Sequence, residues 1–274
     1  MQAEIRSLQQ KSCEKFTSRI IKASALVTDS TILLTRWRPE QSSLENIDRF
    51  REENPFGKSS RSRLSDILPI FRRRYLFDPV IANSLALLVQ RKFPSESLKH
   101  LLFFYSACAD NLLFSFVTEE LWARYRRGRR DLPTDEVIRL LEEWVDAQRT
   151  TSRWGKETIE RVAQGLLATL RDFGVLEGAV NKRLNPPPLT PAAFAFLAFD
   201  LTRAGFSGAQ LLTHPNWSIF FLDANAIERL FIATDQEGLL RFAAAGAVVR
   251  VDFPTSSLED YARFLADASS QSVA

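Results

Sequence analysis

Apolar residues recur at helical spacing along most of this chain, and this periodicity constrains the fold more than any other feature. Positions such as Leu64, Ile67, Leu68 and Phe71 lie three or four residues apart, which places them on one face of an α-helix. Similar helical patterns of apolar residues recur along the chain, separated by residues typical of turns. With 45% hydrophobic and 25% charged residues, the composition is that of a globular protein. The sequence therefore predicts an all-α protein made of multi-helix bundle modules.

The period changes near the C-terminus. Gly205 and Gly208 punctuate short helices, another helix is expected over 224–234, and residues 238–242 and 247–253 then alternate as two strands around a small-residue turn at 243–246. Helix, turn, helix and a two-stranded wing is the order of a winged-helix module. We therefore expect helix-turn-helix or winged-helix-like parts and a short C-terminal β-hairpin.

Charge divides the chain into two parts. Residues 1–130 carry 23 Lys and Arg against 14 Asp and Glu, a net of +9, whereas residues 131–274 carry 13 against 19, a net of −6. At the point where the charge changes sign, the sequence Leu132-Pro133-Thr134-Asp135 ends one helix and is typical of the start of another. The sequence thus predicts a basic N-terminal helical domain over 1–131 and a C-terminal helical domain with the winged-helix-like hairpin over 132–274.

Arginine supplies 28 of the 36 positive side chains, and its planar fork binds phosphate oxygens in pairs where lysine is a point charge. The densest run is Arg-Tyr-Arg-Arg-Gly-Arg-Arg, from Arg124 to Arg130. This run suits a phosphate backbone, with Tyr125 available to stack on a base. The same run would equally suit an acidic protein surface, including the acidic back half of the same chain.

Three further basic segments are candidates. Gly57-Lys-Ser-Ser-Arg precedes a helix start, where free N–H groups and the helix dipole favour a phosphate, although no Walker pattern is present. Consecutive residues 72–74 fan over about 200° of a helix, so not all three can face one ligand. Another basic pair flanks Trp154 at a helix start. The predicted nucleic-acid-binding residues are Lys58, Ser59, Arg61, Arg63, Arg72, Arg73, Arg74, Arg124, Arg126, Arg127, Arg129, Arg130, Arg153 and Lys156.

Residues for catalysis are few. The chain has two histidines, His100 and His214, and its two cysteines, Cys13 and Cys108, lie outside any CxxC pattern. No GxGxxG, GxSxG or HExxH motif occurs. We therefore expect a protein that is not an enzyme and that uses no metal and no cofactor.

No apolar stretch approaches the roughly 20 residues of a membrane span, and the first residues lack the apolar core of a signal peptide. The expected location is the cytoplasm.

The order of these parts resembles the BrxA family of BREX phage-exclusion systems, a family once labelled a domain of unknown function and an inner-membrane protein. The resemblance covers roughly residues 17–254. It rests on the segments 17–34 and 56–61, the apolar helices up to Phe116, the segment 154–176 and the hairpin over 239–254. It implies a largely helical bacterial protein that binds DNA beside other BREX defence proteins, among them a methyltransferase and an ATPase. No catalytic motif transfers from the family.

Together these features predict a non-catalytic component of an anti-phage system that binds double-stranded DNA mainly through backbone phosphates. The alternative is an assembly subunit whose arginine-rich surface binds an acidic protein partner. A regulator that binds RNA is a third possibility.

Overall fold

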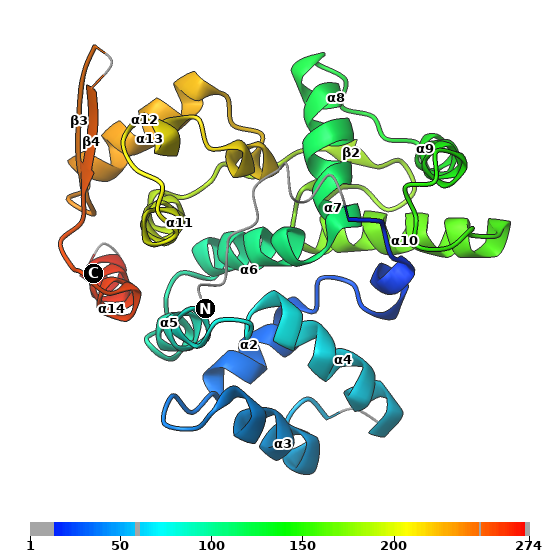
Figure 1. Cartoon of the computed structure of the whole chain (residues 1–274), viewed down its shortest axis with the longest axis horizontal. Helices are drawn as coiled ribbons and strands as arrows, with labels where there is room; N and C mark the ends of the chain where they lie inside the picture. The colour runs from blue at the N-terminus through cyan, green and yellow to red at the C-terminus, as the bar shows by residue number, and fades with distance from the viewer. Residues whose placement is uncertain (1–13, 58–60, 247, 272–274) are drawn as a thin grey trace.

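The computed structural model describes residues 14–57, 61–246 and 248–271, and within these ranges the chain is mostly helical (Figure 1). The N-terminal part of the chain contains the 3-10 helix η1 (Ser18–Lys22), α2 (Val27–Thr35), α3 (Ser43–Glu53), α4 (Arg61–Arg74), α5 (Pro79–Gln90), α6 (Ser95–Ala109), α7 (Asn111–Ser115), the π-helical turn η2 (Phe116–Leu121) and α8 (Trp122–Arg126).

The rest of the chain contains α9 (Thr134–Asp146), α10 (Lys156–Asp172), strands β1 (Leu176–Glu177) and β2 (Arg183–Leu184), α11 (Pro191–Arg203), α12 (Ala209–Leu212), the 3-10 helix η3 (Pro215–Phe220), α13 (Ala224–Gln236), strands β3 (Arg241–Ala245) and β4 (Val248–Asp252), and α14 (Leu258–Gln271). The predicted fold class, helical with a short C-terminal hairpin, is confirmed.

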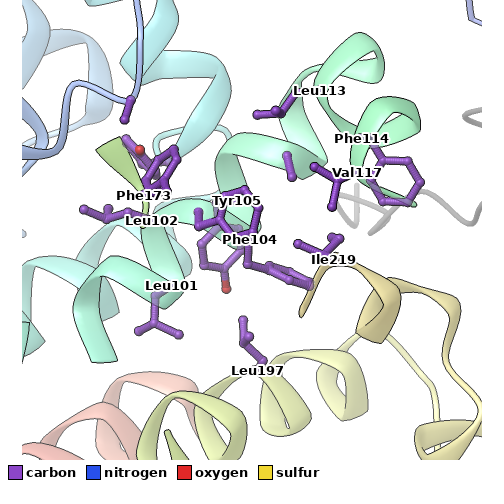
Figure 2. Close-up of a cluster of buried hydrophobic side chains, with 14 of the residues drawn as sticks. Leu101, Leu102, Phe104, Tyr105, Leu113, Phe114, Val117, Phe173, Leu197 and Ile219 are labelled. Atoms are coloured by element: carbon purple, nitrogen blue, oxygen red, sulfur yellow. The ribbon is translucent and has the colours of Figure 1, made fainter. Parts of the chain in front are cut away.

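Helix α6 lies at the centre of the molecule (Figure 1). It packs against α2 and α4 on one side and α11 on another, so it is buried over nearly all of its length. This explains why its sequence is apolar all round rather than on one stripe. Figure 2 shows its residues at the junction with the elements that follow: Leu101, Leu102, Phe104 and Tyr105 of α6 lie near Leu113, Phe114, Val117, Phe173, Leu197 and Ile219.

The apolar stretch from Leu98 to Phe116 does not form one continuous helix. The chain bends by 108° between α6 and the segment Asn111–Arg126. Asp110 causes the break, because its carboxylate accepts hydrogen bonds from the N–H groups of Leu112 and Leu113 and so caps α7. Helix α5 begins in a similar way: the Asp78 carboxylate accepts a hydrogen bond from the Val80 N–H, and Pro79 occupies the first turn.

The C-terminal hairpin lies where it was predicted, but its bounds differ: β3 begins at Arg241 rather than at residue 238, and β4 ends at Asp252 rather than at residue 253. Residues Ala243 to Ala245, expected in the turn, belong to β3 and pair antiparallel with Arg250, Val249 and Val248. Gly246 lies in the turn, and its φ of +60° suits this position. The order α11, α12, α13, β3 and β4 is the order expected of a winged-helix module, and that interpretation stays a prediction.

Contacts cross the predicted domain boundary at residue 131. The last helix, α14, packs on α5, and α11 packs on α6. A buried polar network also joins the two parts: the Tyr105 hydroxyl donates to Asp200 at 2.8 Å, and Arg203 contacts both Asp200 (2.8 Å) and Asp78 (2.9 Å). The division into two domains stays a prediction, and the core runs through both of them.

Among the described residues, no single helix combines the length and the apolar character needed to cross a bilayer. Only α6 taken together with Asn111–Arg126 meets both criteria, and that pair is sharply bent.

Candidate nucleic-acid interface

The arginine run after α8 forms a tight, well-defined turn. The N–H of Gly128 donates to the carbonyl of Tyr125, and the N–H of Arg129 donates to that of Arg124, which is the Schellman pattern of helix termination. Gly128 has a φ of +71°, a conformation that suits glycine. The turn places Arg126 and Arg127 at the end of the helix and sends the next two arginines back toward α9.

Aromatic rings hold two of these arginines. The guanidinium of Arg130 lies 3.8 Å from the centre of the Tyr125 ring, and that of Arg126 lies 5.8 Å from the Trp122 ring. The two rings stack on each other at 6.0 Å, and Phe221 packs against both. Because Arg130 covers the Tyr125 ring, this tyrosine positions an arginine rather than presenting a face for stacking on a base.

A strand from the C-terminal part of the chain adds a fifth arginine that the sequence did not indicate. Strand β2 lies beside residues 130–132, where the Leu184 N–H donates to the Arg130 carbonyl at 2.7 Å. This pairing brings Arg183 into a polar pocket of about 500 Å³ whose other lining residues include Arg129, Arg130 and Glu136. We call Arg126, Arg127, Arg129, Arg130 and Arg183 the basic corner.

Charges inside the basic corner are only partly balanced. Arg129 lies 3.7 Å from Glu136, and Arg183 lies 3.8 Å from Asp131, whose side chain is 87% exposed. Within the described part of the chain, Arg126 and Arg127 are exposed and make no ion pair. The corner therefore carries surplus positive charge at the surface.

Arg124 does not belong to this surface, although it begins the same run. Its side chain is 7% exposed and donates to the Asp131 carbonyl at 2.7 Å and to the Glu136 carboxylate. The hydrogen bond from Arg124 holds the pKa of Glu136 below its ordinary value. Arg124 thus joins α8 to the start of α9, and its prediction as a binding residue is not supported by its position.

The basic residues of α4 divide in the same way. Arg72 is exposed, Arg73 is half-buried, and Arg74 is 5% exposed with its guanidinium bound to the carbonyls of Ser24 and Ala25. Burial, with the nearby Arg19 charge, lowers the pKa of Arg73. Arg63 is exposed and donates to the Lys22 carbonyl. Of the triplet, only Arg72 is fully available to a ligand.

The remaining predicted binding residues either lie apart from the basic corner or fall outside the residues that the structure describes. Arg153 and Lys156 are exposed around the start of α10. Lys58 and Ser59 lie outside the described residues, as does the side chain of Arg61. Figure 1 shows α4 and the end of α8 well apart, with α6 and α7 between them. The predicted residues on α4 and those of the basic corner therefore form two separate basic sites.

Metal ligands do not cluster in the part of the chain that is described: no three His, Cys, Asp or Glu side chains there are placed to hold one ion. The features that stand out are the basic corner and its polar pocket.

Fold and site together define a mostly helical protein that presents an arginine-rich corner at its surface. The profile of the BrxA family matches residues 14–200, more than half of the chain, so the chain belongs to the BrxA family. It is accordingly a component of a BREX phage-defence system. The match ends within α11 and covers α4 and every residue of the basic corner.

The fold also occurs in a solved structure. A crystal structure of an uncharacterized protein from Magnetospirillum magneticum is similar to this chain with a TM-score of 0.57 and 17% identity, over 69% of this chain and 95% of that one. At this identity the similarity shows the fold alone. No curated protein matches the sequence.

Proposed function

We propose that this BREX component binds double-stranded DNA through phosphate contacts of the basic corner, and that it acts without catalysing a reaction. The observation that carries the proposal is the exposed pair Arg126 and Arg127, which make no ion pair among the described residues, next to three further arginines around one pocket. Guanidinium groups bind phosphate oxygens in pairs and carry the charge that neutralises backbone phosphates. Arg72 on α4 is a second, weaker contact site.

Aromatic support makes the corner suited to this task. Arg126 and Arg130 rest on the Trp122 and Tyr125 rings, so less side-chain entropy is lost when they bind an anion. Phosphate contacts position a protein on DNA without reading its sequence. We therefore expect little discrimination between DNA sequences.

Salt dependence tests this mechanism directly. Fluorescence anisotropy with a labelled duplex should give a logarithm of affinity that falls linearly with the logarithm of salt concentration. If all five arginines each neutralise one phosphate, the slope is about −4.5, because each contact contributes about −0.9. Affinity that does not change with salt, or no binding at low salt, would contradict the proposal.

A matched pair of variants locates the surface. The double variant Arg126→Glu/Arg127→Glu takes the formal net charge from +3 to −1, and so does Arg36→Glu/Arg38→Glu, in which two exposed arginines near the end of α2 are replaced. The first should weaken binding to all duplexes alike and make the salt slope less steep by about 2, because two phosphate contacts are lost. The second should leave most of the affinity intact. Equal losses would mean that net charge alone, not the basic corner, governs binding.

The alternative partner, an acidic protein, is distinguished by what accompanies the protein through purification. Protein purified without nuclease should show excess absorbance at 260 nm if it binds nucleic acid, and treatment with DNase or RNase then separates DNA from RNA. A clean protein spectrum together with no anisotropy change would favour a subunit that binds an acidic partner within the BREX assembly.

A further inference from the structure

A largely apolar cavity lies away from the basic corner, where α2, the end of α5, the start of α6 and the end of α10 meet. Its volume is about 500 Å³, within the range of roughly 300–1,000 Å³ typical of small-molecule sites. The apolar part of its wall is formed by Val27, Val89, Phe93, Leu98, Phe173 and Pro187. These residues come from α2, α5 and α6, from the residues just after α5 and α10, and from the segment after β2, so the cavity is a product of the tertiary fold.

One buried polar side chain in the wall has no hydrogen-bond partner. His100 is 3% exposed, and neither ring nitrogen makes a hydrogen bond. Burial, and then the charge of Lys99, lowers the pKa of His100 to about 4, so the ring is neutral at pH 7. Buried polar groups are nearly always hydrogen-bonded, and an exception calls for an explanation. The other histidine, His214, does accept a hydrogen bond, from the N–H of Asn216 at 3.2 Å.

Positive electrostatic features meet at the same wall. Helix α6 begins after Pro94 without a side-chain cap, so its first N–H groups and the positive end of its dipole are open at Ser95 and Glu96, which both line the cavity. The half-buried Lys99 also lines it, and its ammonium nitrogen lies 3.9 Å from where a Cβ on Gly174 would be. The opposing charge, Glu96, is exposed to solvent.

We propose that this cavity binds a small amphipathic acid, whose apolar body fills the space between α2, α5 and α10 and whose carboxylate is held by Lys99 and the start of α6. His100 contributes a neutral imidazole to the polar end of the site. An apolar wall with a few polar groups gathered at one end is the usual form of a ligand site, and a carboxylate complements an ammonium group and a helix N-terminus together. This inference does not depend on DNA binding.

Three probes that differ only in their polar end test the charge preference: phenylbutyrate, phenylbutanol and phenylbutylamine. We expect isothermal titration with the full chain to show phenylbutyrate binding about tenfold more tightly than phenylbutanol, and no binding of phenylbutylamine. Because the chain has only two histidines, imidazole NMR signals locate the site. The signals of His100 should shift on saturation with phenylbutyrate, whereas those of His214 should not.

Two variants and a control complete the test. Lys99→Met should weaken phenylbutyrate about tenfold and leave phenylbutanol unchanged. Lys15→Met, which removes an exposed lysine that does not line the cavity, should change neither. Thr31→Phe places a ring in the cavity from α2 and should abolish both, with circular dichroism confirming the fold. Unshifted His100 signals, binding of phenylbutylamine as tight as that of phenylbutyrate, or equal effects of the two lysine variants would overturn the proposal.

Discussion

The buried network of Asp200, Arg203 and Tyr105 allows a sharp test of how the two parts of the chain are joined. The Asp200 side chain is 1% exposed and is held by Arg203 at 2.8 Å and 3.1 Å and by the Tyr105 hydroxyl at 2.8 Å. The variant Arg203→Met keeps the aliphatic stem but leaves Asp200 buried without its counter-charge. Removing one partner of a buried ion pair lowers the free energy of unfolding by about 3–5 kcal/mol. For Arg203→Met near pH 8 we expect the lower end, about 3 kcal/mol, because Arg203 is 31% exposed and is already partly solvated.

The effect of pH has a definite sign. Burial raises the pKa of Asp200 above its ordinary 3.8, and the charge of Arg203 opposes this shift, so removing Arg203 raises the pKa further. A carboxylate whose pKa is higher in the folded state makes folding more favourable at low pH, and this contribution is lost as pH rises through the folded-state value. The decrease in the free energy of unfolding caused by Arg203→Met should therefore be smaller near pH 5 than near pH 8.

Urea denaturation followed by tryptophan fluorescence at pH 5 and pH 8 measures the destabilisation caused by Arg203→Met and its dependence on pH. The control is Arg171→Met, which removes the arginine of an exposed pair with Asp172 and should cost no more than about 0.5 kcal/mol. A loss for Arg203→Met as small as that of the control, or one that grows as pH falls, would refute the reasoning.

Two further changes test the core and the α8–α9 junction. Phe104→Ala, at a side chain 1% exposed that stacks on Phe220 at 6.2 Å, should lower the free energy of unfolding by about 3–5 kcal/mol in the same assay, whereas Leu44→Ala at 59% exposure should change it little. Arg124→Met should lower the melting temperature in differential scanning fluorimetry by the equivalent of roughly 2–4 kcal/mol, because Glu136 and the Asp131 carbonyl lose their donor, and Arg127→Met should not. Equal melting temperatures would show that Arg124 is not structural.

Local chemistry explains which parts of the fold were predictable. The start of α5 follows from Asp78-Pro79, because the cap and the proline act within a few residues of themselves. The hairpin follows from alternation in a short window. The break at Asp110 carried a signal too, since aspartate is a preferred N-cap, but the apolar pattern continues through it and suggests one long helix.

Assigning the arginines required information that is not local. Arg124 and Arg127 are identical in type and three residues apart, yet one is buried against Glu136 and the other is exposed. One signal was present: Glu120 lies four residues before Arg124 on the same helix face, and the two are 3.7 Å apart. Arg183 had no such signal, because only the pairing of β2 with residues 130–132 brings it to the basic corner.

Whether an arginine side chain is bound to groups within the fold therefore indicates its function better than the number of arginines around it in the sequence. Arg74 and Arg124 have their guanidinium groups bound to carbonyls or carboxylates, so moving them onto DNA would break contacts within the fold at a cost that phosphate binding must exceed. Arg126 and Arg127 face no such cost. Binding energy at the proposed interface should therefore be concentrated at these two positions, and reversing Arg72 on the separate α4 site should change affinity far less.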